Sequence, residues 1–263
     1  MIRKILNILL LIAIPAGLFL LLGFAVEQNR QLPSSPLQVS IDYHCGHHFI
    51  EAEAVKAKVL NATSEIEGKP IADGKLRQIE SVVQGIPYVQ KASVFRNING
   101  ELHIDITQRQ PILRVINAHN HSFYIDRAGR MMPLSDDYTA RVLIATGHIN
   151  AGYSPLTDLL EKKDPKEISS NEQRLRDLHR MATFIENDPF WNAFIDHIYV
   201  TPSGQFELTP KYGGHIVEFG GIDQMEHKFK KLMVFYQNGL TRTGWNHYRR
   251  INVKYSNQVI CSK

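Results

Sequence analysis

The sequence predicts an α+β protein with a single N-terminal transmembrane helix, a small β-α-α-β-β domain and a larger mixed β domain with packed helices. Three observations support this prediction. An apolar run opens the chain, strand and helix patterns alternate through residues 37–109, and further strand patterns with two helical stripes occupy residues 110–263. Because each element must bury its apolar face against another, each segment is expected to form a layered core.

The predicted membrane anchor covers residues 5–26. At 1.5 Å per residue such a helix is roughly 33 Å long, enough to cross a hydrocarbon core of about 30 Å. Arg3 and Lys4 precede the run, and Glu27 is the first charge after it. The positive-inside rule then leaves residues 1–4 in the cytoplasm. We therefore expect a single-pass protein of the inner (cytoplasmic) membrane whose bulk is periplasmic or extracytoplasmic.

A cleaved secretory signal is the competing interpretation, because Gly23-Phe24-Ala25 offers small residues at a plausible cleavage spacing. The apolar regions of such signals usually span only about 7 to 15 residues, which favours a retained helix. Both interpretations export the rest of the chain. Residues 27–36, with Pro33 and Pro36, are expected to form a short spacer before the folded part.

The composition indicates folded exported domains. Hydrophobic residues make up 43% and charged residues 21% of the chain, which are close to globular norms. The net charge of +4 is mild. Lys228, Lys230 and Lys231 form the densest basic group, but they sit among apolar helix positions. We interpret them as a solvated helix face and expect no nucleic-acid partner.

The small domain is expected to begin with a strand, because apolar and polar residues alternate from Leu37 to Tyr43. Two helices follow. Residues 50–60 are rich in Ala, Glu and Lys, and an apolar stripe through residues 76–83 comes after Asp73, a candidate helix cap. These patterns place two helices against one face of a sheet.

A β-hairpin is predicted to close this domain. Residues 92–96 and 102–107 alternate with a period of two, and Asn99-Gly100 lies between them. Asn-Gly supplies the positive φ angles that a tight primed turn requires. The order of elements is therefore β-α-α-β-β, enough for a three-stranded sheet.

The larger domain is predicted to be a sheet with helices packed against it. Asp126 to Gly129 forms a turn, and residues 151–171 are a weakly patterned polar region. Helical stripes cover residues 175–185 and 225–236. The predicted strands cover residues 111–115, 122–126, 194–200, 205–209, 215–219 and 250–260, the last of which closes the chain.

Four short motifs follow one another along the chain. They are Pro87-Tyr-Val89 leading into Ala92-Ser-Val94, Gln108-Arg-Gln-Pro111, Tyr124-Ile-Asp-Arg-Ala-Gly129 and Ile251-Asn-Val-Lys-Tyr255. In this order behind one anchor, they resemble the FtsQ/DivIB family of bacterial cell-division proteins over nearly the whole chain. Gln108 stands where the family has Glu, and Asn252 and Lys254 stand where its closing motif has Asp and Arg. Any charge pairing that the family makes there is in doubt.

The resemblance implies a domain of the POTRA type at residues 37–109 and an FtsQ-type β domain at residues 110–263. It also implies a scaffold without catalytic activity or cofactor, which recruits other divisome membrane proteins to the division septum. The expected partners are an FtsB/DivIC-like coiled-coil protein and the FtsL-like protein bound to it.

The partner-binding residues that the resemblance implies are Tyr255, Ser256, Asn257 and Val259 on the C-terminal strand. Physical chemistry supports this mode, because an edge strand carries unpaired N–H and C=O groups that can dock an extended peptide. Tyr255 is a candidate aromatic anchor, although a place in the core was an equal alternative. Ile251 and Val253 are expected to face the core.

The other groups of polar residues that could form a site suit structural roles better. His44, Cys45, His47 and His48 lie too close together in sequence to enclose one metal ion, so we expect no metal site. No Ser or Cys pairs with a His in a nucleophile motif, so no catalytic residue is assigned. The carboxylates of Asp126, Asp136 and Asp137 suit turns better than acid/base work. A disulfide between Cys45 and Cys261 is open but unsupported.

Two other functions are alternatives to the scaffold. One is an anchored POTRA protein in outer-membrane protein assembly or translocation, which a C-terminal membrane β-barrel would favour; no series of lipid-facing strand patterns is present. The other is an anchored hydrolase, which would need convergent polar groups in a pocket.

Overall fold

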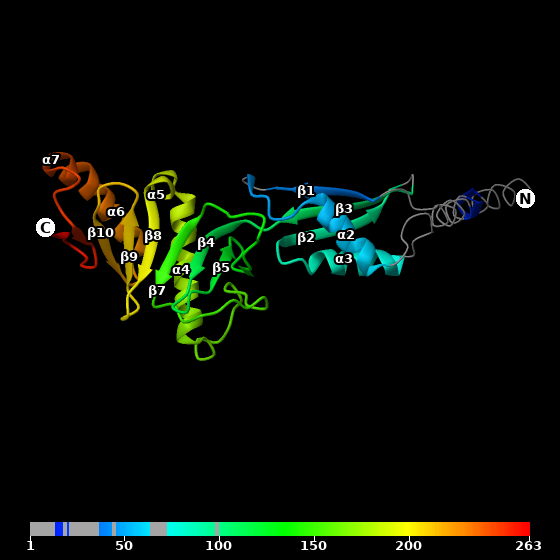
Figure 1. Cartoon of the computed structure of the whole chain (residues 1–263), viewed down its shortest axis with the longest axis horizontal. Helices are drawn as coiled ribbons and strands as arrows, with labels where there is room; N and C mark the ends of the chain where they lie inside the picture. The colour runs from blue at the N-terminus through cyan, green and yellow to red at the C-terminus, as the bar shows by residue number, and fades with distance from the viewer. Residues whose placement is uncertain (1–13, 18–19, 21–36, 44–45, 64–72, 98–99) are drawn as a thin grey trace, which may run out of the picture. The chain divides into compact units, whose positions relative to one another are not determined.

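A computed structural model describes residues 14–17, 20, 37–43, 46–63, 73–97 and 100–263 (Figure 1). The chain divides into two compact units, Met1–Gln108 and Arg109–Lys263. Among the described residues, no helix is long and apolar enough to cross a membrane. Of the predicted span 5–26, only residues 14–17 and 20 are described, and they are helical; the spacer 27–36 and residues 1–4 lie outside the described residues.

The first unit has the predicted β-α-α-β-β order. Its sheet has the order β1-β3-β2, with β1 parallel and β2 antiparallel to β3. The helices cover one side of the sheet (Figure 1), where Val55, Val59, Ile79 and Val83 join Ile104 in one core. The elements are β1 (Gln38–Asp42), α2 (Ala52–Ala62), α3 (Asp73–Gln84), β2 (Val89–Arg96) and β3 (Leu102–Gln108).

The predicted hairpin between β2 and β3 is confirmed. The strands pair antiparallel, and the Asn97 N–H donates to the Glu101 carbonyl at 2.8 Å at the turn. Gly100 has a φ of 84°, which glycine adopts without steric cost. Asn99 lies outside the described residues.

The second unit is built on a nine-stranded mixed sheet with the order β12-β11-β10-β9-β8-β7-β4-β5-β6. Pairs β4–β7, β7–β8 and β10–β11 are parallel, and the other pairs are antiparallel. The strands are β4 (Pro111–Ile116), β5 (Ser122–Asp126), β6 (Met131–Met132), β7 (Leu143–Gly147), β8 (Ile195–Val200), β9 (Phe206–Pro210), β10 (Ile216–Gly220), β11 (Arg250–Asn252) and β12 (Ile260–Ser262).

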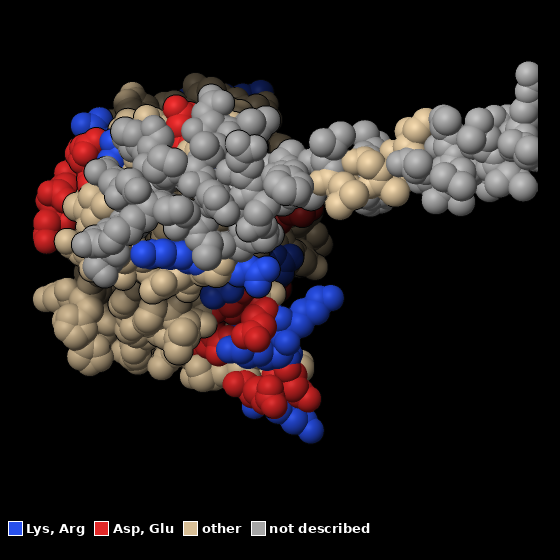
Figure 2. Space-filling view, turned by 90° about the vertical axis from the view of Figure 1, so that its right-hand side faces the viewer, with Lys and Arg blue, Asp and Glu red and all other residues tan. Residues whose placement is uncertain are grey.

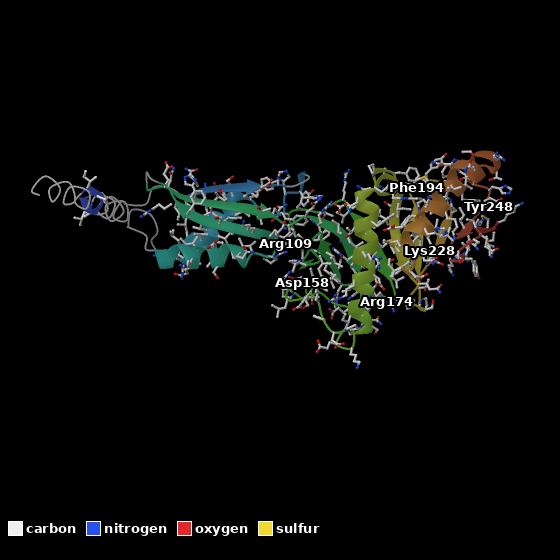
Figure 3. The ribbon with its side chains drawn as sticks, turned by 180° about the vertical axis from the view of Figure 1, so that it is seen from behind. Arg109, Asp158, Arg174, Phe194, Lys228 and Tyr248 are labelled. Atoms are coloured by element: carbon white, nitrogen blue, oxygen red, sulfur yellow. The ribbon has the colours of Figure 1, made fainter. Side chains whose placement is uncertain are left out.

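Helices α4 (Ser170–Asn187) and α6 (Met225–Phe235) lie on one face of this sheet, the face that Figure 3 views. The predicted α4 stripe is buried, and Ser169 caps the helix by accepting the Glu172 N–H. Phe229 of α6 packs on the rings of Phe184, Trp191 and Phe219, with centroids 4.7, 5.0 and 4.9 Å away. This aromatic cluster fixes α6 against α4 and the sheet.

Several short elements were not predicted, among them β6 and α7 (Thr241–Thr243) as well as those described next. Strand β7 lies between β4 and β8, and helix α5 (Pro189–Phe194) begins where the sequence suggested only a stop. The Asp188 side chain accepts the Phe190 and Trp191 N–H groups, and Pro189 occupies the first turn, so these residues start a helix. A π-helical turn, η2 (Tyr236–Leu240), extends α6.

The prediction of one closing strand over residues 250–260 is wrong. Strand β11 ends at Asn252, the chain loops through residues 253–259, and β12 returns antiparallel to β11. The alternation of apolar residues continues through Tyr255. However, side chains of α6 form hydrogen bonds with the backbone carbonyls there, and these residues do not continue the strand.

Candidate functional site

The most distinctive feature of the second unit is the end of the sheet that β12 forms. Ile251 pairs with Cys261 and Asn252 with Ile260, so the inner side of β12 is occupied. Among the described residues no other strand pairs with its outer side. Ile260 on this strand is 46% exposed. The outer edge therefore presents backbone groups and apolar surface together.

Two α6 side chains hold the loop that leads into β12. The Lys231 ammonium donates to the Val253 carbonyl at 2.8 Å and to the Tyr255 carbonyl. His227, one turn earlier, places Nε2 3.2 Å from the Ser256 carbonyl oxygen. Because residues four apart share a helix face, both side chains reach the same loop. Burial lowers the pKa of Lys231, with the nearby Lys228 charge adding to the effect.

A groove of about 670 Å³ lies between this loop and the end of α6. On the helix side, Val234, which is 51% exposed, and the half-buried Phe235 give the lining apolar surface beside Lys230 and Lys231. The loop supplies Ser256, Asn257 and Val259. The groove can accept an apolar side chain beside the open edge of β12.

A charged network supports β11 from the neighbouring strands. Glu218 of β10 accepts from Arg250 Nε at 2.5 Å and from the Asn252 amide at 2.7 Å, and the Lys254 ammonium lies 3.5 Å from it. Arg250 also donates to Glu207 of β9. The hydrogen bond from Arg250 is the main cause that lowers the pKa of Glu218. Asn252 can donate to this carboxylate, whereas an Asp there could not.

The structure places the predicted partner-binding residues in the loop before β12 and not within a strand. Tyr255 is 51% exposed, Ser256 and Asn257 are exposed, and Val259 is half-buried against the core. The prediction that Ile251 and Val253 face the core is confirmed, since both are fully buried. The exposure of Tyr255 resolves the alternative that it belongs to the core.

Sequence analysis missed the contribution of α6. Lys231 was interpreted as part of a solvated face, but it positions the loop, and Lys228 is buried with its ammonium 2.9 Å from the Gly221 carbonyl (Figure 3). Lys230 alone of the three is exposed. On the face drawn in Figure 2, acidic and basic side chains are interspersed. The apolar Val234, outside the buried stripe, was the available signal for a surface site.

Two of the sequence motifs meet in an ion pair inside the second unit. Arg109 of the Gln-Arg-Gln-Pro motif donates to Asp126 at 2.8 Å, and the same carboxylate accepts the Arg130 N–H at 2.7 Å. Asp126 thus has a turn role, as predicted. Within the first unit, the Gln108 amide donates to the His47 carbonyl and accepts the Phe49 N–H, both at 2.8 Å. An ionised Glu could not make the first of these bonds.

The described residues contain no group of three or more His, Cys, Asp or Glu side chains that could hold a metal ion. His44 and Cys45 lie outside these residues. The Cys261 thiol is free, and burial raises its pKa. Asp136 and Asp137 are exposed in a loop, where the Asp137 N–H donates to the Ser135 hydroxyl.

Comparison with known proteins matches each unit to a family. Residues 34–107 match the POTRA-like domain, and residues 110–262 match the family FtsQ/DivIB, C-terminal related. A cell division protein FtsQ from Rhodothermus marinus is 25% identical over 238 residues, covering 82% of this chain and 81% of its own length.

A solved structure of POTRA1-2 of the periplasmic domain of Omp85 from Anabaena is also similar, at 10% identity and a TM-score of 0.26. The match covers 33% of this chain and 53% of that structure, so this chain spans about half of the length of that structure. A likeness with this identity and TM-score supports no conclusion about this chain. The match of residues 110–262, together with the POTRA-like match before it, shows that the chain belongs to the FtsQ/DivIB family of cell-division proteins.

Proposed function

We propose that the chain is a non-enzymatic, membrane-anchored scaffold of the bacterial division machinery. Residues 5–26 anchor it in the cytoplasmic membrane with the N-terminus inside, and the second unit recruits an FtsB/DivIC-like protein, with its FtsL-like partner, to the septum. The partner segment adds a strand to the open side of β12.

The observation that carries this proposal is the open edge of β12 at the end of the sheet. Strand addition gains affinity from main-chain hydrogen bonds and specificity from alternate side chains. Beside the edge, Tyr255 and Ile260 offer exposed apolar surface, and the groove by Val234 offers a pocket for a side chain. Lys231 and His227 hold the loop in place before binding, which reduces the entropy lost on association.

The test is a binding assay with the full chain in detergent and a purified FtsB/FtsL-like pair. The informative variant lacks residues 260–263, because a deletion that starts at Arg250 would also remove the buried Ile251 and Val253 from the core. We expect the short deletion to abolish binding while the thermal unfolding midpoint shows that the unit remains folded. Leu156→Ala, at a residue that is 88% exposed on another loop, serves as the matched control.

Undiminished binding by the folded deletion variant would contradict strand addition at β12. Loss of binding by the Leu156 control as well would show that the assay reports general surface damage. The anchor is tested separately: the full chain should stay in the membrane fraction after alkaline extraction, and removal of residues 1–26 should release it.

A further inference from the structure

A second groove of about 470 Å³ lies in another part of the second unit. It is formed by β4, the loop before β7, the starts of β7 and β8, helices α4 and α5, and the residue that follows β9. The lining residues include three cations, Arg114, Arg141 and Lys211, and one carboxylate, Asp196. The side chains around this groove therefore carry a net charge of +2, three positive minus one negative.

Arg114 is held in place by neutral groups. It lies in β4 opposite Tyr124 of β5 and Ile144 of β7. Its Nε donates to the Ser122 hydroxyl at 3.0 Å, and its guanidinium carbon lies 5.8 Å from the centre of the Tyr124 ring. These contacts fix the side chain without neutralising its charge, and its terminal nitrogens can still donate to a carboxylate in bidentate fashion.

The other two cations also lack a counter-ion. Within the described residues, neither Arg141 nor Lys211 has a carboxylate within 4.0 Å, and both are exposed. The Lys211 ammonium donates only to the Asn192 carbonyl, at 3.4 Å. Asp196 is exposed at a register shift between Ile195 and His197, where a bulge re-aims side chains.

The base of the groove is apolar. Val142, Leu143 and Ile144 line it and are half-buried, and the fully buried Ile185 and Ile195 line it as well. A ligand for this groove must therefore combine negative charge with apolar groups. A duplex or single-stranded nucleic acid fits poorly, because its phosphates need an extended basic stripe.

We propose that this groove binds an acidic peptide segment of a partner protein. The carboxylates of the segment pair with Arg114, Arg141 and Lys211, and a neighbouring apolar side chain packs on Val142 and Ile144. This surface is distinct from β12, since β9, β10 and β11 lie between β8 and β12. At about 4.8 Å per strand, β8 and β12 are roughly 19 Å apart. The proposal does not rest on strand addition, and the two surfaces can be occupied together.

The test measures fluorescence anisotropy of a labelled peptide of alternating Glu and Leu, titrated with the full chain in detergent. A peptide with Gln in place of every Glu is the ligand control. We expect binding of the acidic peptide in the millimolar range or tighter, weakened about tenfold or more by Arg141→Gln and by Lys211→Gln. Both residues are exposed, so neither substitution threatens the fold. Lys162→Gln, on an exposed loop, should leave affinity unchanged.

Several outcomes would overturn the proposal. They are equal affinity for the Gln peptide, equal weakening by Lys162→Gln, or no rise in anisotropy when the chain reaches about 1 mM. Vesicles containing phosphatidylglycerol are the second probe in this test. Binding to these vesicles that depends on Arg141, without binding to the peptide, would assign the groove to a lipid surface instead.

Discussion

The two ends of the nine-stranded sheet are built in opposite ways. At the β6 end, Met131 and Met132 are buried, and residues near Asp158 cover the edge: Arg130 and Asp158 form a β-bridge, and the Leu159 N–H donates to the Gly129 carbonyl at 3.0 Å. At the β12 end, no described strand pairs with the outer edge. An uncovered edge is an aggregation hazard, and the proposed strand addition would cover it.

The largest expected effect comes from opening the covered end. Leu159 belongs to the segment that covers β6 and is 1% exposed. Leu159→Ala should lower the free energy of unfolding by about 2 to 5 kcal/mol, because it leaves a cavity in the covering layer. Chemical denaturation measures this loss. At temperatures where the variant is folded, binding at β12 should be unchanged; weakened binding there would mean that the two ends are coupled.

Releasing the loop beside the open end should have the next largest effect. Lys231→Ala removes the ammonium that donates to the Val253 and Tyr255 carbonyls. We expect the unfolding free energy to fall by about 1.5 to 3 kcal/mol, and the affinity for the FtsB/FtsL-like pair to fall as well. Lys230→Ala, next to it but exposed, should leave stability unchanged. Equal stability of both variants would show that the loop does not depend on Lys231.

Tyr255 tests the open end without disturbing the fold. Tyr255→Ala should weaken partner binding by more than about 1 kcal/mol if the ring is an interface anchor, while stability changes by less than about 0.5 kcal/mol. Isothermal titration calorimetry and thermal unfolding give the two values. If Tyr255→Ala bound the partner with the affinity of the wild type, Tyr255 would not be part of the site.

A smaller, pH-dependent effect is expected at the start of β10. His215 is buried with Nε2 2.9 Å from the Tyr236 hydroxyl, and burial lowers its pKa below the ordinary value of about 6.5. The unfolded chain therefore binds a proton at His215 more readily than the folded chain does. The stability that neutral His215 contributes is complete above pH 6.5 and is lost as the pH falls from there through the lowered pKa. The midpoint of urea unfolding between pH 7.5 and pH 5 should drop less in His215→Gln than in the wild type, whereas exposed His148→Gln should match the wild type.

The sequence predicted the parts of the fold that depend on local pattern. The first unit, the α4 stripe and the Asp126 turn all follow from periodicity, capping and turn chemistry. Strand β7 was missed because five residues paired in parallel on both sides carry no alternation. Asp188-Pro189 is typical of a helix stop, but here the same residues cap and start a helix, so the sequence pattern does not predict α5.

The candidate site was harder to predict for a physical reason. Its positions around Tyr255 follow from the family resemblance, but their conformation depends on Lys231 and His227, which are 24 and 29 residues away from the carbonyls of Tyr255 and Ser256. Alternation alone indicated a strand through residue 260. The groove lined by Arg114, Arg141 and Lys211 likewise combines residues from β4, the loop before β7 and the position after β9, which no local pattern connects.

Amide hydrogen exchange of residues 260–262 in the full chain, with and without the FtsB/FtsL-like pair, tests the central claim most directly. Strand addition predicts that exchange at this outer strand slows when the pair binds, because N–H groups that faced water become paired, while exchange at the covered β6 end stays the same. Binding of the pair with no change in exchange at residues 260–262 would contradict the claim that β12 is the docking edge.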